Sequence, residues 1–228
     1  MIYFHGGGYR IASALAYRAY CSNLVHHAKV RVLNVDYRLA PENPFPAAVD
    51  DAVAAYEWAL AQGTPASRIV LAGDSAGGGL TAAALVAIRD RGLATPAGGI
   101  CLSPWADLSN SSPSFRTRAD VDKMFSITSA MEAAQLYLHG TDPRTPLASP
   151  IYADLTGLPP LLILVGDAES LLDDAHRLAT RAASVGVMTQ VNVYMEMPHV
   201  WAMNYPAYPE AVAAFDDMAA FVARVTAA

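Results

Sequence analysis

A serine stands in the middle of a glycine-flanked pentapeptide, Gly-Asp-Ser-Ala-Gly, at residues 73–77. The pattern G-x-S-x-G is typical of a nucleophile elbow, a sharp turn between a strand and a helix that presents a serine hydroxyl. An apolar run over 68–72 precedes this turn, and a small, apolar, helix-compatible run over 78–88 follows it. We therefore predict that Ser75 is a nucleophile, although a serine beginning an ordinary helix would give the same pentapeptide.

A second stretch suited to chemistry is His5, which three glycines at 6–8 follow directly. Consecutive glycines let backbone N–H groups approach a bound group without interference from side chains. Two such N–H groups would suit the oxyanion of an acyl-transfer intermediate. The alternatives are a flexible turn or a phosphate loop, but neither phosphate-loop pattern, G-x-x-x-x-G-K-[ST] or G-x-G-x-x-G, is present here.

A serine nucleophile needs a base, and three histidines follow Ser75 along the chain. His139 ends a predicted helix, where a cation suits the helix dipole, and His176 lies within another helix. Only His199 falls in a loop after a predicted strand, over 190–194, and downstream of every candidate acid. In triads of this type the acid and then the histidine follow the nucleophile, so we predict that His199 is the base.

The acid of such a triad should lie in the loop after the continuous apolar strand over 161–165. Asp173 and Asp174 fall in the first turn of the next helix, where carboxylates suit the helix dipole. Asp167 is nearest the end of the strand, whereas Glu169 has a longer side chain and lies farther out in the loop. The residues alone leave the choice between Asp167 and Glu169 open.

Strands that alternate with helices must position these loops. We predict strands over 1–4, 30–35, 68–72, 99–102, 161–165 and 190–194, and helices over 16–29, 46–62, 76–88, 128–139, 171–185 and from 209 onward. This alternation indicates an α/β fold with a mostly parallel sheet covered on both faces. Each candidate loop follows a strand, so all of them should meet at the carboxyl edge of the sheet.

Composition narrows the class of protein. The chain has 228 residues, of which 54% are hydrophobic and 16% charged, which excludes a disordered chain. A net charge of −6 disfavours nucleic acid and anionic membranes as partners. We find no apolar run of spanning length and no signal peptide. Cys21 and Cys101 are expected to be buried residues in a reducing cytoplasm, where we place the protein.

From residue 103 to about 160 the regular pattern breaks, and Ser, Asn, Pro and Asp dominate over 107–113. A long irregular insertion in an α/β chain is often a lid or a substrate-binding segment. We therefore expect one domain over 1–228, in which 103–160 forms a cap or lid. Five apolar side chains could line a pocket there, or could simply belong to the core: Trp105, Met124, Phe125, Met131 and Tyr137.

Taken together, several stretches resemble the hormone-sensitive-lipase family of α/β-hydrolase esterases. They are residues 5–8, 36–42, 73–78, 169–174 and His199, in the family's order. The resemblance implies the α/β-hydrolase fold and a D/E-x-L-x-D pattern whose first position, here Glu169, holds the acid. Most family members have Asp at that position.

The resemblance also implies roles for individual residues. Ser75 would be the nucleophile, His199 the base, and His5 would orient the glycine loop. The oxyanion would be bound by N–H groups of Gly6, Gly7 and Ala76. These roles predict hydrolysis of short- to medium-chain acyl esters, with no metal or cofactor. A ligand-binding relative that has lost catalysis, or an inactive fragment, is the alternative.

The family normally carries an N-terminal cap and two further strands ahead of the strand that here begins at Met1. We accordingly expect a shortened domain whose strand over 30–35 is an exposed edge of the sheet. Among partners we expect a small acyl ester as substrate, and we allow for a homodimer.

Overall fold

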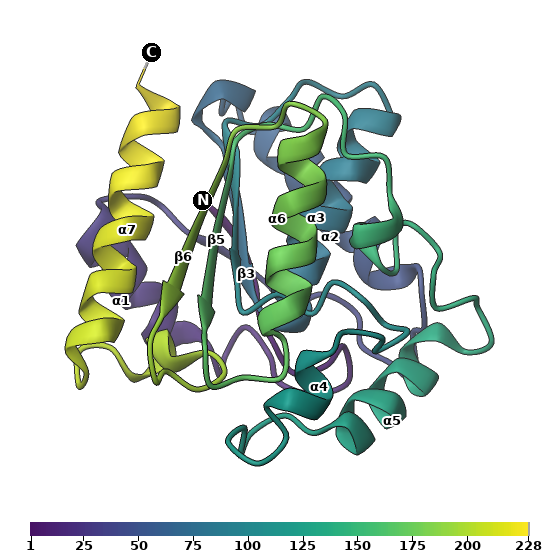
Figure 1. The fold of residues 1–228 in the computed structure, drawn as a ribbon. Coiled ribbons are helices and arrows are strands. Elements are labelled where there is room, and N and C mark those ends of the chain that lie inside the picture. The colour runs from purple at the N-terminus through teal and green to yellow at the C-terminus, as the bar shows by residue number, and fades with distance from the viewer. Residues whose placement is uncertain (228) are drawn as a thin grey trace.

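The computed structural model describes residues 1–227, and a six-stranded parallel sheet forms its middle layer (Figure 1). Along the sheet the strands stand in the order β2-β1-β3-β4-β5-β6. Their bounds are β1 Ile2–Phe4, β2 Leu33–Val35, β3 Val70–Asp74, β4 Gly98–Leu102, β5 Leu161–Gly166 and β6 Thr189–Tyr194. Every neighbouring pair is parallel, as the alternation of strands and helices predicted.

Helices cover both faces of the sheet (Figure 1). One face carries α1 and α7, the other carries α2, α3 and α6, and α4 and α5 lie beyond the carboxyl ends of the strands. The helices are α1 Arg18–Ala28, α2 Ala47–Ala61, α3 Ala76–Asp90, α4 Ser114–Thr117, α5 Ile127–Leu138, α6 Leu172–Ser184 and α7 Pro209–Thr226. Single turns of 3₁₀ helix occur at 66–68, 150–152 and 201–204.

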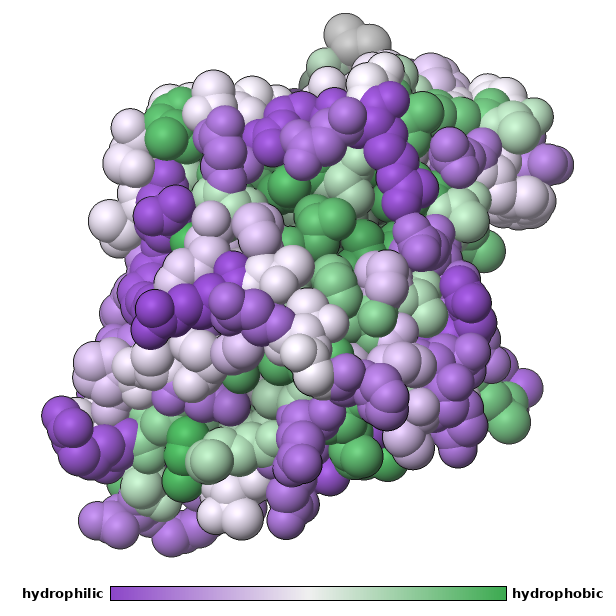
Figure 2. Space-filling view, turned by 90° about the vertical axis from the view of Figure 1, so that its right-hand side faces the viewer, coloured by the Kyte–Doolittle hydropathy of each residue, from purple (hydrophilic) through white to green (hydrophobic). Residues whose placement is uncertain are grey.

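The core is split into two layers because side chains of a strand alternate between the two faces of the sheet. The four inner strands β1, β3, β4 and β5 are buried along their whole length. Helix α3 is buried from Ala76 to Ile88, which its nearly uniform apolar composition predicted. Seen from the side of α2, α3 and α6, polar side chains surround a central group of apolar ones (Figure 2).

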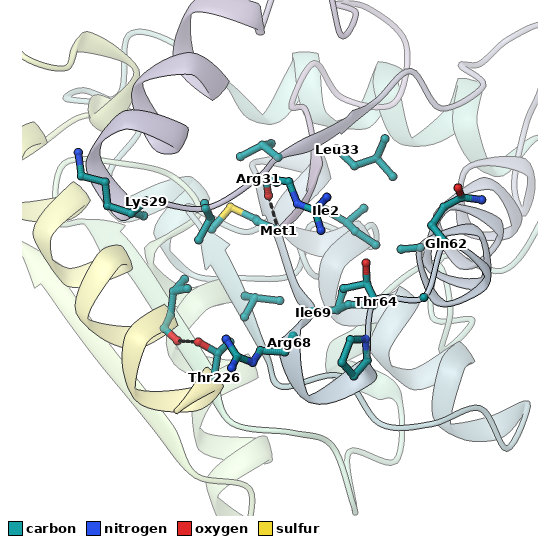
Figure 3. A pocket seen from close by; sticks show the side chains of 18 of the residues that line it. Met1, Ile2, Lys29, Arg31, Leu33, Gln62, Thr64, Arg68, Ile69 and Thr226 are labelled. Atoms are coloured by element: carbon teal, nitrogen blue, oxygen red, sulfur yellow. Dashed lines mark hydrogen bonds between the residues drawn. The ribbon is translucent and has the colours of Figure 1, made fainter. Parts of the chain in front are cut away.

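The two edges of the sheet are β2 and β6, so the prediction of an edge at the strand after α1 is confirmed. Beside β2, a hollow opens at the amino ends of β1, β2 and β3, with Met1, Ile2, Leu33 and Ile69 among its walls (Figure 3). The hollow lies at the opposite end of the strands from the loops that carry the candidate site residues.

The structure departs from the sequence-based predictions at the ends of elements, in the burial of two valines and in one additional short helix. Val25 and Val185 were expected on inward faces, but they are 42% and 41% exposed. Val25 lies outside the buried stripe of α1, and Val185 comes after the last residue of α6, Ser184. The short helix α4 was not predicted. Both cysteines are free and buried.

Candidate active site

The turn between β3 and α3 holds Ser75 in a strained conformation, with φ 54° and ψ −121°. Glycines on both sides make this turn sterically possible. A Cβ on Gly77 would lie 2.0 Å from the carbonyl oxygen of Phe4, and a Cβ on Gly73 would lie 2.3 Å from the carbonyl oxygen of Gly77. The end of β1 therefore packs directly against the first turn of α3, and the glycine loop that follows β1 lies beside Ser75.

Three side chains from three loops form a continuous hydrogen-bonded chain at this edge of the sheet. The Ser75 hydroxyl donates to Nε2 of His199 over 2.9 Å. The Nδ1–H of the same ring donates to Oε2 of Glu169 over 2.5 Å. Glu169 is fully buried, and Ser75 and His199 are 7% and 6% exposed. The arrangement can remove the serine proton and stabilise the imidazolium that results.

The geometry differs between the two candidate acids, which the residues alone left open and of which the family resemblance favoured Glu169. Within residues 1–227 Asp167 makes no hydrogen bond to His199, and its carboxylate accepts the N–H of Glu196 over 2.5 Å. Asp167 therefore braces the loop that carries His199, whereas Glu169 contacts the ring. Oxygen Oε1 of Glu169 is anchored by the N–H of Gly166 at 2.7 Å and the hydroxyl of Ser103 at 2.9 Å.

The surroundings of His199 favour its protonated form. Burial lowers the pKa of the ring, but the hydrogen bond and charge of Glu169, together with the charges of Asp122 and Asp74, outweigh burial and raise the pKa. The ring of Phe125 stacks on His199 with centroids 5.5 Å apart. Phe125 belongs to the irregular segment 103–160, so that segment contributes directly to the surroundings of the base.

The N–H of Gly6 was expected to bind an oxyanion, but in the structure it already has hydrogen-bond partners. It donates to Oδ1 of Asp74 at 3.1 Å and approaches the hydroxyl of Tyr17 at 3.2 Å, so it is already engaged. Within residues 1–227, the N–H groups of Gly7, Gly8 and Ala76 make no hydrogen bond. The N–H of Gly8 therefore has no competing partner, whereas that of Gly6 does.

Asp74, the residue before Ser75, is a buried carboxylate that holds the glycine loop. The hydroxyls of Tyr3 and Tyr17 each donate to it over 2.8 Å, in addition to the Gly6 N–H. Burial raises the pKa of Asp74, although the two tyrosine hydrogen bonds oppose this shift. The sequence does not predict these contacts, because Tyr3 and Tyr17 lie far from Asp74 along the chain and in separate elements.

Tyr37 fixes the other side of the glycine loop, a role that the sequence analysis missed. Its ring stacks on His5 at 4.4 Å, and its hydroxyl donates to the His5 carbonyl over 2.7 Å. The Nδ1–H of His5 in turn donates to the carbonyl of Gly6 over 2.7 Å. The turn over 36–42 is thus tied to the site through a buried tyrosine.

A second buried carboxylate, Asp174, shapes the loop after β4. One of its oxygens accepts the N–H groups of Ala106 and Asp107, each over 2.9 Å, and the other accepts the hydroxyl of Ser112. The sequence suggested only that Asp174 suits the dipole of α6. The structure instead shows it inside the protein, as the anchor of a loop that borders the site.

Among residues 1–227, no group of three or more His, Cys, Asp or Glu side chains is placed to hold a metal ion. No helix in that range is both long and apolar enough to cross a lipid bilayer.

Comparison with known proteins places this geometry in context. The sequence model of the family of proteins with the alpha/beta hydrolase fold matches residues 1–203 of this chain. An acetyl-hydrolase of Streptomyces hygroscopicus is 47% identical over 226 residues, which cover 99% of this chain and 76% of the relative.

Solved structures are similarly close. The crystal structure of an esterase from the bacterial hormone-sensitive lipase family superposes with a TM-score of 0.97 at 51% identity, covering 99% of this chain and 76% of the other. The crystal structure of EstE5 soaked with p-nitrophenyl butyrate gives a TM-score of 0.97 at 45% identity, covering 100% and 77%. In each comparison the chain spans about three quarters of its relative.

Proposed function

Since the chain belongs to the family of α/β-hydrolase fold proteins and is a hydrolase of the esterase type, we propose that it cleaves carboxylic esters through Ser75, His199 and Glu169. The observation that carries this proposal is the unbroken chain of hydrogen bonds from the Ser75 hydroxyl through the His199 ring to the Glu169 carboxylate. All three residues follow strands whose carboxyl ends meet at one edge of the sheet.

In the proposed reaction, Nε2 of His199 accepts the proton of Ser75 while the serine oxygen attacks the ester carbonyl. Glu169 keeps the proton of the neutral ring on Nδ1 and stabilises the charged ring that forms. His199 then gives its proton to the leaving alcohol, and the acyl group stays on Ser75. A water molecule, activated by the same histidine, attacks the acyl group and restores the free serine.

The oxyanion of each tetrahedral intermediate needs N–H donors in fixed positions. We assign this role to Gly7, Gly8 and Ala76, with Gly8 in place of the Gly6 suggested by the sequence. Their unengaged N–H groups support the assignment, as does the position of Ala76 at the N-terminus of α3, where the helix dipole favours negative charge. Asp74 and Tyr37 hold the loop that carries two of the three donors.

Short- to medium-chain acyl esters are the proposed substrates. One close relative is named an acetyl-hydrolase, and crystals of another were soaked with p-nitrophenyl butyrate. We propose that segment 103–160 acts as a cap within a single domain. In support, Phe125 stacks on the base, and α5 lies against the glycine loop, where Arg10 donates to Ser129 over 3.2 Å.

A panel of p-nitrophenyl esters from acetate to palmitate tests this function on the chain as it stands. We expect the highest kcat/KM between acetate and octanoate, and loss of turnover in Ser75→Ala with an unchanged circular dichroism spectrum. Undiminished hydrolysis by Ser75→Ala would refute the mechanism. A folded wild-type chain without esterase activity would favour the alternative, a ligand-binding or inactive relative.

A further inference from the structure

Ser103, the residue directly after β4, combines full burial with an unusual backbone. Its φ is 46°, in the left-handed region that residues other than glycine seldom adopt. Val200, next to His199, has a φ of 51°. The N–H of Val200 donates to Oγ of Ser103 over 3.2 Å, so one hydrogen bond joins two strained residues from different loops. Backbone strain of this kind persists where the surrounding structure enforces it, often at functional sites.

The direction of the Ser103 hydroxyl proton follows from its neighbours. Because the Val200 N–H is a donor, Oγ of Ser103 must accept there, and its single proton is free to point elsewhere. That proton points to Oε1 of Glu169, 2.9 Å away. The backbone N–H of Ser103 also donates to the carbonyl of Leu164 in β5 over 2.7 Å, which fixes the residue against the neighbouring strand.

These contacts determine how Glu169 presents its carboxylate. Oε1 receives two donors, the Ser103 hydroxyl and the Gly166 N–H, which leaves Oε2 to face Nδ1 of His199. A glutamate has one more rotatable bond than an aspartate, so its carboxylate needs more external contacts to stay in one orientation. The Ser103 hydroxyl is the only side-chain donor to this carboxylate besides His199 itself within residues 1–227.

We propose that Ser103 is a positioning residue, which orients the Glu169 carboxylate toward His199 and ties the loop of the acid to the loop of the base. The inference rests on the proposed triad. Ser103 touches neither the substrate nor the reacting atoms, and it acts on the reaction through Glu169. A purely structural role, in which the hydroxyl only satisfies the N–H of Val200, would lower stability without any link to the acid.

A double-mutant cycle between Ser103→Ala and Glu169→Gln separates these two roles. On p-nitrophenyl butyrate, Ser103→Ala should lower kcat by about 10- to 100-fold, the loss expected for a missing hydrogen bond to a charged group, with KM changed less than about threefold. In the Glu169→Gln background the same substitution should lower kcat by less than about threefold, because the acid that Ser103 orients is already gone.

Ser149→Ala is a matched control. Ser149 is equally buried, and its hydroxyl also bridges two segments, donating to the Pro143 carbonyl over 2.6 Å and accepting the Leu108 N–H over 2.7 Å. This substitution should lower the melting temperature while kcat stays within about twofold of the wild type. Ser103→Gly relieves the backbone strain but lacks the hydroxyl, so it should lose as much kcat as Ser103→Ala.

Three results would overturn the inference: full kcat in Ser103→Ala, full kcat in Ser103→Gly, or an equal loss from Ser103→Ala in both backgrounds. If Glu169→Gln itself kept full kcat, the proposed acid would be wrong, and that failure is distinguishable because it appears in the single variant.

Discussion

Replacing Asp174 by Asn should remove a specific pH dependence of stability. Burial raises the pKa of this carboxyl from its usual 3.8 to about 7, with the Ser112 hydrogen bond opposing and the Asp107 charge reinforcing the shift. The folded protein therefore holds this proton up to about pH 7, while the unfolded chain releases it near pH 3.8. Through this group, stability falls as pH rises across that window.

The size of the effect follows from the shift. Each pH unit inside the window changes the free energy of unfolding by about 1.4 kcal/mol, so the roughly three-unit shift gives about 4 kcal/mol in total. The asparagine cannot titrate, yet its oxygen can still accept the N–H groups of Ala106 and Asp107, and its amide can donate to Ser112. Relative to the wild type, Asp174→Asn should gain stability as pH rises from 4 to 7.

Urea unfolding at half-unit pH steps measures this difference, since every other carboxylate is common to both proteins. Asp51→Asn is the contrasting control. Burial favours a higher pKa for Asp51, but its contacts with Arg38 prevail and lower the pKa. Its stabilising contribution is therefore lost only as pH falls below 3.8, so the difference in stability between Asp51→Asn and the wild type should stay nearly constant from pH 4 to 7. A difference between Asp174→Asn and the wild type that does not vary with pH would refute the reasoning.

Further substitutions test the site itself. Glu169→Gln should lower kcat by about 10²- to 10⁴-fold. Asp167→Asn only weakens the hydrogen bond to the Glu196 N–H, so it should lower kcat by less than about tenfold. A larger loss of kcat in Asp167→Asn than in Glu169→Gln would identify Asp167 as the acid. The contacts of His199 raise its pKa above 6.5, so the fall of kcat/KM on the acid side of the pH profile should be centred above pH 6.5 in the wild type. In Glu169→Gln this midpoint should move to lower pH, and a midpoint that does not move would contradict the assignment. Gly77→Ala would place a Cβ 2.0 Å from a backbone oxygen, so it should destabilise the fold by about 1–3 kcal/mol and reduce kcat. A melting temperature in calorimetry and a kcat that both match the wild type would contradict this close packing.

Much of the fold was predictable because local patterns determine it. Alternating apolar strands and helices predicted every strand of the sheet, and the loops at their carboxyl ends carry the residues singled out for chemistry. The boundaries shifted by one to three residues, which is why Val185 lies beyond the end of α6. The exposed Val25 shows that helical spacing alone does not fix the width of a buried stripe.

The site was less predictable where a role depends on the direction of a bond. Whether Gly6 can bind an oxyanion depends on Asp74 and Tyr17, which capture its N–H. The residues alone left Asp167 and Glu169 open, and only the family's D/E-x-L-x-D pattern favoured Glu169. The structure adds which of the two side chains contacts the ring. A polar residue directly after a buried strand, such as Ser103, was the one available signal for a further site residue.

The most direct test of the central claim is to trap the acyl intermediate. The protein would be mixed with p-nitrophenyl butyrate, quenched in acid within milliseconds, digested and analysed by mass spectrometry. The account predicts one butyryl group on the peptide that contains Ser75, and no such group in Ser75→Ala. Ester hydrolysis with a butyryl group on another residue, or hydrolysis that persists in Ser75→Ala, would contradict it.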